Sequence, residues 1–208
     1  YSGKLRRRLG ALTLTRMKGT SFADAIRRLS WNGRPTQVDV TEADWNGHTV
    51  AVETFTNEFW TSKQRAANSL HEISYRACFK PQLVNFFVQR LTEPGDLVYD
   101  PFLGRGTTVV EAAWLDRAAT GCDVNPLSRV LTKPRLAPPT LAQVSERLRA
   151  LDWTSCDSYP EDLTVFFHPE TLNRICALRA YLRKLHAEGA MDEVDEWIEM
   201  VAVNRLTG

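Results

Sequence analysis

The sequence lacks the patterns that mark several common classes of protein. Its four cysteines form no Cys-x-x-Cys pair and its four histidines have no metal-ligand spacing, so neither a zinc site nor a disulfide framework is expected. No apolar run approaches the ~20 residues that span a bilayer. The first residues also lack the apolar stretch of a signal peptide. These absences predict a metal-free cytoplasmic protein with reduced thiols and no membrane span.

Charge is almost balanced over the chain but unevenly placed. The net charge is +1, yet residues 1–35 hold nine lysines and arginines against one acid, whereas residues 188–199 hold six acids and no base. A basic segment can contact nucleic-acid phosphates through charge and counterion release. A solvated surface or a flexible arm would explain the same charges, and the sequence leaves these interpretations open. The composition, 43% hydrophobic and 25% charged, is that of a folded protein.

The middle of the chain alternates helix and strand signals. Pro81 begins an apolar helical pattern that runs to about Thr92, and Pro94-Gly95-Asp96 ends it. The pattern that follows predicts a strand at 97–99, a loop at 104–106, a helix at 107–115 and a strand at 118–124. One strand–loop–helix–strand unit of this kind predicts an α/β fold.

Shorter signals flank this unit, and no internal repeat is present. On the N-terminal side, residues 1–30 are basic and helix-prone, Asn46-Gly47 suits a turn, and 50–55 suits a strand. On the C-terminal side we predict helices at 142–151, 169–186 and 192–204, and a strand at 163–167.

The loop after the first predicted strand of the α/β unit combines glycines with an acid. Gly104 and Gly106 let the backbone approach a bulky ligand, because they lack a Cβ atom and tolerate positive φ. Open α/β sheets bind ligands at the carboxyl ends of their strands, where this loop lies. A second acid, Asp123, ends the next predicted strand, where it can accept hydrogen bonds from both hydroxyls of a ribose.

The kind of ligand follows from what the loop does not contain. Val109 stands where the dinucleotide fingerprint has its third glycine, and the Gly-Lys-Ser/Thr of a nucleoside-triphosphate loop is absent. Asp100 would repel a pyrophosphate but attract a cation, such as the amino group or sulfonium of S-adenosylmethionine. The alternative is that Asp100-Pro101 caps the strand and the glycines only make a turn.

The loop has a counterpart in a known family. Residues 97–108, Leu-Val-Tyr-Asp-Pro-Phe-Leu-Gly-Arg-Gly-Thr-Thr, resemble the cofactor loop D-P-F-x-G-x-G-T-T of DNA methyltransferases that act on the amino group of adenine or cytosine. Glu111-Ala112-Ala113 and residues 121–126 fit the same pattern, and 75–81 resemble the segment before the first strand. The resemblance spans about residues 71–131. It implies a Rossmann-like S-adenosylmethionine methyltransferase sheet with flanking helices, incomplete at the C-terminus.

The resemblance also implies where the cofactor binds. The methionine part would lie at the glycine loop and the ribose at Asp123, and the segment before the first strand would close the pocket from the other side. Lys80 would face the cofactor carboxylate or lie on the surface as an ordinary lysine; for His71 we favour packing over cofactor contact. The expected cofactor-binding residues are Tyr75, Phe79, Lys80, Asp100, Pro101, Phe102, Gly104, Gly106, Thr107, Asp123 and Asn125.

One motif of these enzymes has no counterpart here. The family carries Asp, Asn or Ser followed by Pro-Pro and an aromatic residue, which together hold the amino group to be methylated. Residues 137–140, Ala-Pro-Pro-Thr, have only the prolines. Catalytic residues therefore stay unassigned. We expect the motif to lie beyond Gly208, so that the chain is a fragment; the alternatives are missing loops or an inactive subunit.

The predicted function is S-adenosylmethionine-dependent methylation of an exocyclic amino group of adenine or cytosine in DNA, in restriction-modification or a related process. The alternatives are an RNA amino-methyltransferase and a catalytically inactive cofactor- or DNA-binding subunit. DNA is the expected partner, with the basic N-terminal region as a candidate contact; the oligomeric state is not predicted. The predicted regions are a basic N-terminal region with short strands at 1–60, a cofactor-binding α/β core at 61–135, and a mainly helical segment at 136–208 that continues beyond the chain.

Overall fold

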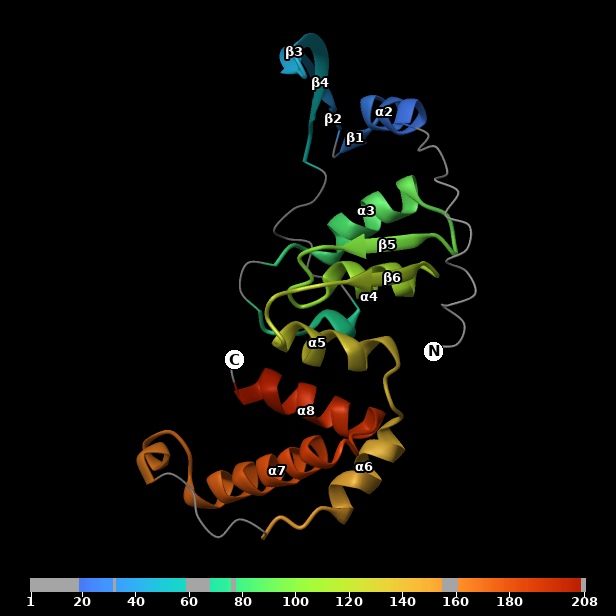
Figure 1. Ribbon diagram of the computed structural model, residues 1–208. Coiled ribbons are helices and arrows are strands. Elements are labelled where there is room, and N and C mark those ends of the chain that lie inside the picture. Colours follow the sequence, from blue (N-terminus) through green and yellow to red (C-terminus); the bar gives the residue numbers. More distant parts are fainter. Residues whose placement is uncertain (1–18, 32, 59–67, 76–77, 155–160, 207–208) are drawn as a thin grey trace.

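The computed structural model describes residues 19–31, 33–58, 68–75, 78–154 and 161–206 (Figure 1). It is a mixed α/β structure in which small sheets are flanked by helices. Among these described residues, no helix combines the length and the apolar character that crossing a membrane requires. Most of the basic N-terminal segment, residues 1–18, lies outside the described part.

The N-terminal part consists of a helix and two hairpins. Helix α2 (Gly19–Arg27) precedes β1 (Ser30–Trp31) and β2 (Arg34–Pro35), and then the longer strands β3 (Gln37–Trp45) and β4 (His48–Thr56). The β3–β4 hairpin closes at Asn46-Gly47, where both residues have positive φ, 53° and 79°, as a tight hairpin turn requires. The predicted turn and the strand predicted at 50–55 are therefore confirmed. The hairpin points away from the rest of the molecule (Figure 1).

The α/β unit follows the predicted order. Helix α3 (Pro81–Leu91) leads to β5 (Leu97–Asp100), α4 (Thr107–Trp114) and β6 (Ala118–Gly121). Strands β5 and β6 are parallel, with Leu97 opposite Ala118 and Asp100 opposite Gly121. Helix α4 packs against both strands and α3, and its Val109, Val110 and Ala112 are at most 3% exposed. The strand–loop–helix–strand prediction is confirmed, although the second strand ends at Gly121 instead of at residue 124.

Helices make up the C-terminal part. Helix α5 (Leu127–Thr132) and the 3-10 turn η2 (Lys133–Leu136) precede α6 (Leu141–Ala150), α7 (Pro169–Glu188) and α8 (Glu193–Leu206). The predicted helices are confirmed to within about two residues at each end. Helix α8 lies beside α5 (Figure 1), and a small core of Ile73, Leu131 and Met200 joins α5 and α8 to the segment before α3.

The strand predicted at 163–167 is wrong. The structure has a 3-10 turn, η3 (Glu161–Val165), and Val165 and Phe166 are 81% and 77% exposed. Valine and phenylalanine favour strands, but a strand also needs a partner for its backbone. No strand lies beside this segment among the described residues, and His168-Pro169 starts α7 immediately after it.

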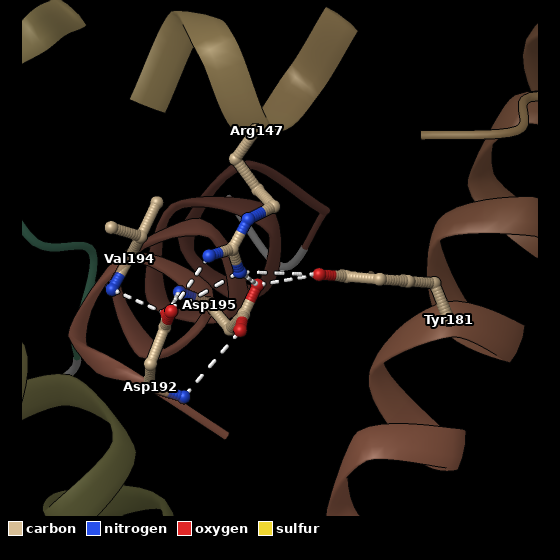
Figure 2. A network of polar contacts seen from close by, with 5 residues as sticks. All are labelled: Arg147, Tyr181, Asp192, Val194 and Asp195. Atoms are coloured by element: carbon tan, nitrogen blue, oxygen red, sulfur yellow. Dashed lines mark hydrogen bonds and ion pairs between the residues drawn. The ribbon is translucent and has the colours of Figure 1, made fainter. Parts of the chain in front are cut away.

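A polar network joins the three C-terminal helices (Figure 2). Arg147 of α6 forms ion pairs with Asp192, at 2.6 Å, and with Asp195. The Tyr181 hydroxyl of α7 donates to the Asp195 carboxylate at 2.8 Å. Asp192 also accepts the backbone N–H groups of Val194 and Asp195, at 2.9 Å each, which fixes the start of α8. One guanidinium therefore holds α6, α7 and α8 together.

Candidate functional site

The glycine loop connects β5 to α4 at the carboxyl end of the sheet. Gly106 has a φ of 79°, and a Cβ atom added there would lie 2.2 Å from Oγ1 of Thr132 in α5. Close packing on α5 and the left-handed backbone therefore require glycine at this position. Gly104 has a φ of 51°, but a Cβ there would meet only ordinary contacts, with Cε1 of Tyr75 at 3.6 Å. Gly104 thus leaves space beside the Tyr75 ring, whereas Gly106 is enclosed by protein.

Asp123, just after β6, is joined to the glycine loop. Its carboxylate accepts the backbone N–H of Gly104 at 2.7 Å and that of Asn125 at 2.8 Å. These bonds, first that from Asn125 and then that from Gly104, lower the pKa of the exposed Asp123 below its usual value. The side chain is therefore an exposed anion at neutral pH. Each carboxylate oxygen retains acceptor capacity for a further donor.

Asp100 shapes the loop from the other strand. It is only 9% exposed, and its Oδ1 accepts the backbone N–H of Phe102 at 3.0 Å. The backbone N–H of Leu103 donates to the carbonyl of Cys122 at 2.9 Å, and the N–H of Cys122 donates to the carbonyl of Asp100 at 3.0 Å. These two hydrogen bonds hold the loop against the chain that follows β6. Phe102 is 85% exposed, and Pro101 is exposed beside it.

The segment before α3 lies against the same loop. Tyr75 is half-buried, whereas Phe79 and Lys80 are exposed. Arg105, between the two glycines, donates to the carbonyl oxygens of Ile73 at 3.0 Å and His71 at 3.2 Å. A longer bond of 3.5 Å reaches the carbonyl of Phe79. Sequence reasoning did not identify Arg105; an arginine within a Gly-x-Gly loop was the available signal.

Two residues of the predicted set use their side chains within the protein. Thr107 is buried, and its hydroxyl accepts a bond from Nε of Arg105 at 3.0 Å. The Asn125 side chain accepts the backbone N–H of Leu127 at 3.0 Å, at the start of α5. These contacts give both residues a structural role in the loop.

Two buried residues, His71 and Glu111, form a polar triad with the half-buried Asn85. Nε2 of His71 is 2.9 Å from Oε2 of Glu111, and Asn85 donates to Oε1 of Glu111 at 2.8 Å. Burial raises the pKa of Glu111, but the hydrogen bonds of His71 and Asn85 outweigh it, and the net pKa lies below the usual value. The triad joins the 3-10 turn η1 (Ser69–His71), α3 and α4. The packing role favoured for His71 agrees with this burial.

The structure thus brings Tyr75, Gly104 and Asp123 to one place, at the ends of β5 and β6. Lys80 immediately precedes α3, and its position relative to a ligand stays a prediction. Within the described ranges, no three His, Cys, Asp or Glu side chains are grouped so that they could hold a metal ion.

Comparisons with known proteins agree on one family. The sequence profile described as DNA methylase matches residues 24–129, about half of the chain, and includes the whole glycine loop. The type II methyltransferase M.MjaII of Methanocaldococcus jannaschii is 33% identical over 76 residues, which are 36% of this chain and 14% of the relative. M.MvaI of Kocuria varians is 29% identical over 97 residues, 45% of this chain and 20% of the relative.

A third relative, the type II methyltransferase M.BsoBI of Geobacillus stearothermophilus, is 32% identical over 86 residues, 40% of this chain and 17% of its own length. The matched segments therefore span a fifth or less of each of these three relatives. No solved structure gives a significant match.

Proposed function

Because this chain belongs to the DNA methylase family, we propose that it binds S-adenosylmethionine at the glycine loop and serves the methylation of an exocyclic amino group of adenine or cytosine in DNA. The observation that carries the proposal is the bond of 2.7 Å from the Gly104 N–H to the Asp123 carboxylate. This bond fixes an exposed anion across the loop, at the carboxyl ends of two parallel strands, where α/β sheets bind ligands.

The residues present fit the cofactor. Asp123 accepts one N–H on each oxygen and keeps acceptor capacity for the two hydroxyls of a ribose. The nearby Asp100 adds a second acid, so the loop suits a cationic ligand better than a pyrophosphate. Tyr75, Phe79 and Phe102 offer aromatic surface for the adenine or the sulfonium. When bound, the cofactor supplies an activated methyl group; the chain's own residues bind and orient it.

We also propose that β5 and β6 belong to a Rossmann-like sheet and that α4 is one of its flanking helices. Leu97 and Tyr99 alternate along β5 with the more buried Val98 and Asp100, so they share one face of the strand, and they are 50% and 58% exposed. Parallel sheets are normally covered on both faces. This exposure is consistent with further secondary structure packed on that face in the functional protein. We propose residues 61–135 as the cofactor-binding core and residues 136–208 as a helical region.

DNA is the proposed substrate because the matching family is described as DNA methylase, and the three relatives named as type II methyltransferases favour a role in restriction-modification. The basic N-terminal region stays a candidate DNA contact. Among the described basic residues of this region, Arg27 forms ion pairs with Asp24 at 2.5 Å and Glu53 at 2.7 Å, so its charge is already compensated. An assay of methyl transfer to DNA and to RNA, with the protein purified from its native source, decides between the two substrates. Transfer to RNA alone would overturn the proposal.

Asp123→Ala tests the cofactor site. We expect the unsubstituted chain to bind S-adenosylmethionine in the low to middle micromolar range, and Asp123→Ala to weaken binding by roughly one to two orders of magnitude, the scale of charge-assisted hydrogen bonds. Isothermal titration calorimetry measures both affinities. Glu146→Ala, which removes an exposed acid from α6, is the matched control and should bind normally. Unchanged affinity in Asp123→Ala would place the ribose elsewhere.

A further inference from the structure

The segment that forms one side of the proposed site is held by side chains from distant parts of the chain. This wall segment, residues 68–75 and 78–80, contains no strand or α-helix and only the short turn η1. Its backbone carbonyl and N–H groups therefore need partners elsewhere. Arg105 of the glycine loop supplies some of them, as described above, and two further side chains supply others.

Arg135 of η2 joins the wall segment to the glycine loop. The residue is 2% exposed, and its guanidinium donates to the carbonyl oxygens of Leu70 at 2.8 Å, Leu131 at 2.6 Å, and Arg105. Burial, and secondly the charge of Arg105, lower the pKa of Arg135 to about 10, so it remains a cation at neutral pH. A buried cation is costly unless it is hydrogen-bonded, so these carbonyls are held firmly around it.

Asn204 of α8 holds the same segment from the C-terminal helices. Its Oδ1 accepts the backbone N–H of Ser74 at 2.7 Å, and its Nδ2 donates to the carbonyl of Glu72 at 3.3 Å. Between these two residues, Ile73 is buried against Leu131 and Met200. Helix α8 lies outside residues 24–129, the part that matches the family profile.

Asn204 bonds the residue next to Tyr75, and Arg135 bonds Leu70, earlier in the same segment. Tyr75 follows Ser74 directly, and its ring lies beside Gly104: a Cβ atom added to Gly104 would be 3.6 Å from Cε1 of Tyr75. A site whose walls are already ordered in the free protein binds its ligand more tightly, because binding then carries no entropic cost of ordering the wall. Displacement of a positioning element by even ~1 Å has large effects on a site.

We propose that Arg135 and Asn204 are positioning residues for the cofactor, and that α8 thereby couples the C-terminal helices to cofactor affinity. The proposal rests on the cofactor-binding function proposed above. Neither residue contacts the exposed carboxylate of Asp123; both act through the wall segment.

Asn204→Ala is the first test. We expect a roughly fivefold to tenfold weaker affinity for S-adenosylhomocysteine in calorimetry, the loss that follows from two missing hydrogen bonds to a wall that must then be ordered on binding. Hydrogen exchange at the Ser74 amide should become faster in the ligand-free chain. Asn204→Asp keeps the acceptor for Ser74 but loses the donor to Glu72, so it should restore slow exchange at the Ser74 amide and recover only part of the affinity. Arg174→Ala removes an exposed ion pair within α7 and is the matched control.

Arg135→Lys is the second test, because lysine keeps the charge but cannot reach all the carbonyls at once. We expect weaker binding of S-adenosylhomocysteine and faster amide hydrogen exchange across the wall segment. Amide exchange can be measured even if the variant is less stable. If the unsubstituted chain binds no cofactor, both this proposal and the proposed function are overturned. If it binds, and Asn204→Ala and Arg135→Lys bind as tightly as Arg174→Ala, this proposal alone is wrong.

Discussion

Replacing Gly106 with alanine is expected to destabilise the protein by about 3 kcal/mol or more, the sum of an overpacked contact and a left-handed non-glycine residue. The added Cβ would lie 2.2 Å from Oγ1, 2.6 Å from Cγ2 and 2.9 Å from Cβ of Thr132. Thr132 is 4% exposed and β-branched, so its side chain has little room to move away. Urea unfolding of the variant and the unsubstituted chain measures the difference.

Gly104→Ala is the matched control for this substitution. Its backbone is also left-handed, at a φ of 51°, but the new Cβ would meet only Tyr75 at 3.6 Å and a backbone oxygen at 3.9 Å. We expect a loss of stability of only about 1–2 kcal/mol, from the backbone alone. In the background of Thr132→Gly, Gly106→Ala should become less harmful, because the clashing atoms are gone. Equal effects of the two glycine substitutions would show that α5 does not pack on Gly106 as described.

Arg147→Met is expected to lower the free energy of unfolding by about 3 kcal/mol, near the lower end of the range for breaking a buried ion pair. The Asp195 side chain is 2% exposed and would lose its cationic partner, whereas the partial exposure of Arg147, 29%, moderates the loss. Thermal and urea unfolding measure it. Arg174→Met breaks the exposed pair with Glu170 in α7 and should cost only about 0.3–0.5 kcal/mol. Similar losses in both variants would contradict the network in Figure 2.

The same network predicts a dependence on pH. The hydrogen bond from Arg147 is the largest cause that lowers the pKa of Asp192 from 3.8 to about 2. Because the folded pKa is below the unfolded one, this stabilisation is present above the unfolded pKa and is lost as the pH falls toward the folded pKa. The stability difference between the unsubstituted chain and Arg147→Met should therefore narrow between about pH 5 and pH 2. A difference that stays constant over this range would assign the stabilisation to another group.

The sequence was sufficient where short-range patterns decide the structure. The β5–α4–β6 unit follows from an apolar strand, a glycine loop and an apolar helix face within 25 residues, and the β3–β4 turn follows from Asn46-Gly47. The closeness of Gly104 and Asp123 follows from parallel strands that end at the same edge. In each case the interacting residues lie within one supersecondary unit.

The sequence was insufficient where distant segments meet. Asn204 and Ser74 are 130 positions apart, and nothing local marks either residue as a partner. Arg135 stands in a proline-rich connector, where an arginine normally faces solvent, yet three backbone carbonyls make its burial tolerable. At 163–167, the strand propensity of the residues gave a wrong prediction. A strand needs a neighbouring strand to pair with, and the described structure has none beside this segment.

We propose that Asp123, fixed by Gly104 across the glycine loop, receives the ribose of the cofactor. A crystal structure of the chain with S-adenosylhomocysteine tests this most directly. We predict both ribose hydroxyls within hydrogen-bonding distance of the Asp123 carboxylate, at roughly 2.5–3.0 Å, with the Gly104–Asp123 bond retained and the Tyr75 ring beside the ligand. A ligand bound elsewhere, or a ribose that makes no contact with Asp123, would contradict this placement.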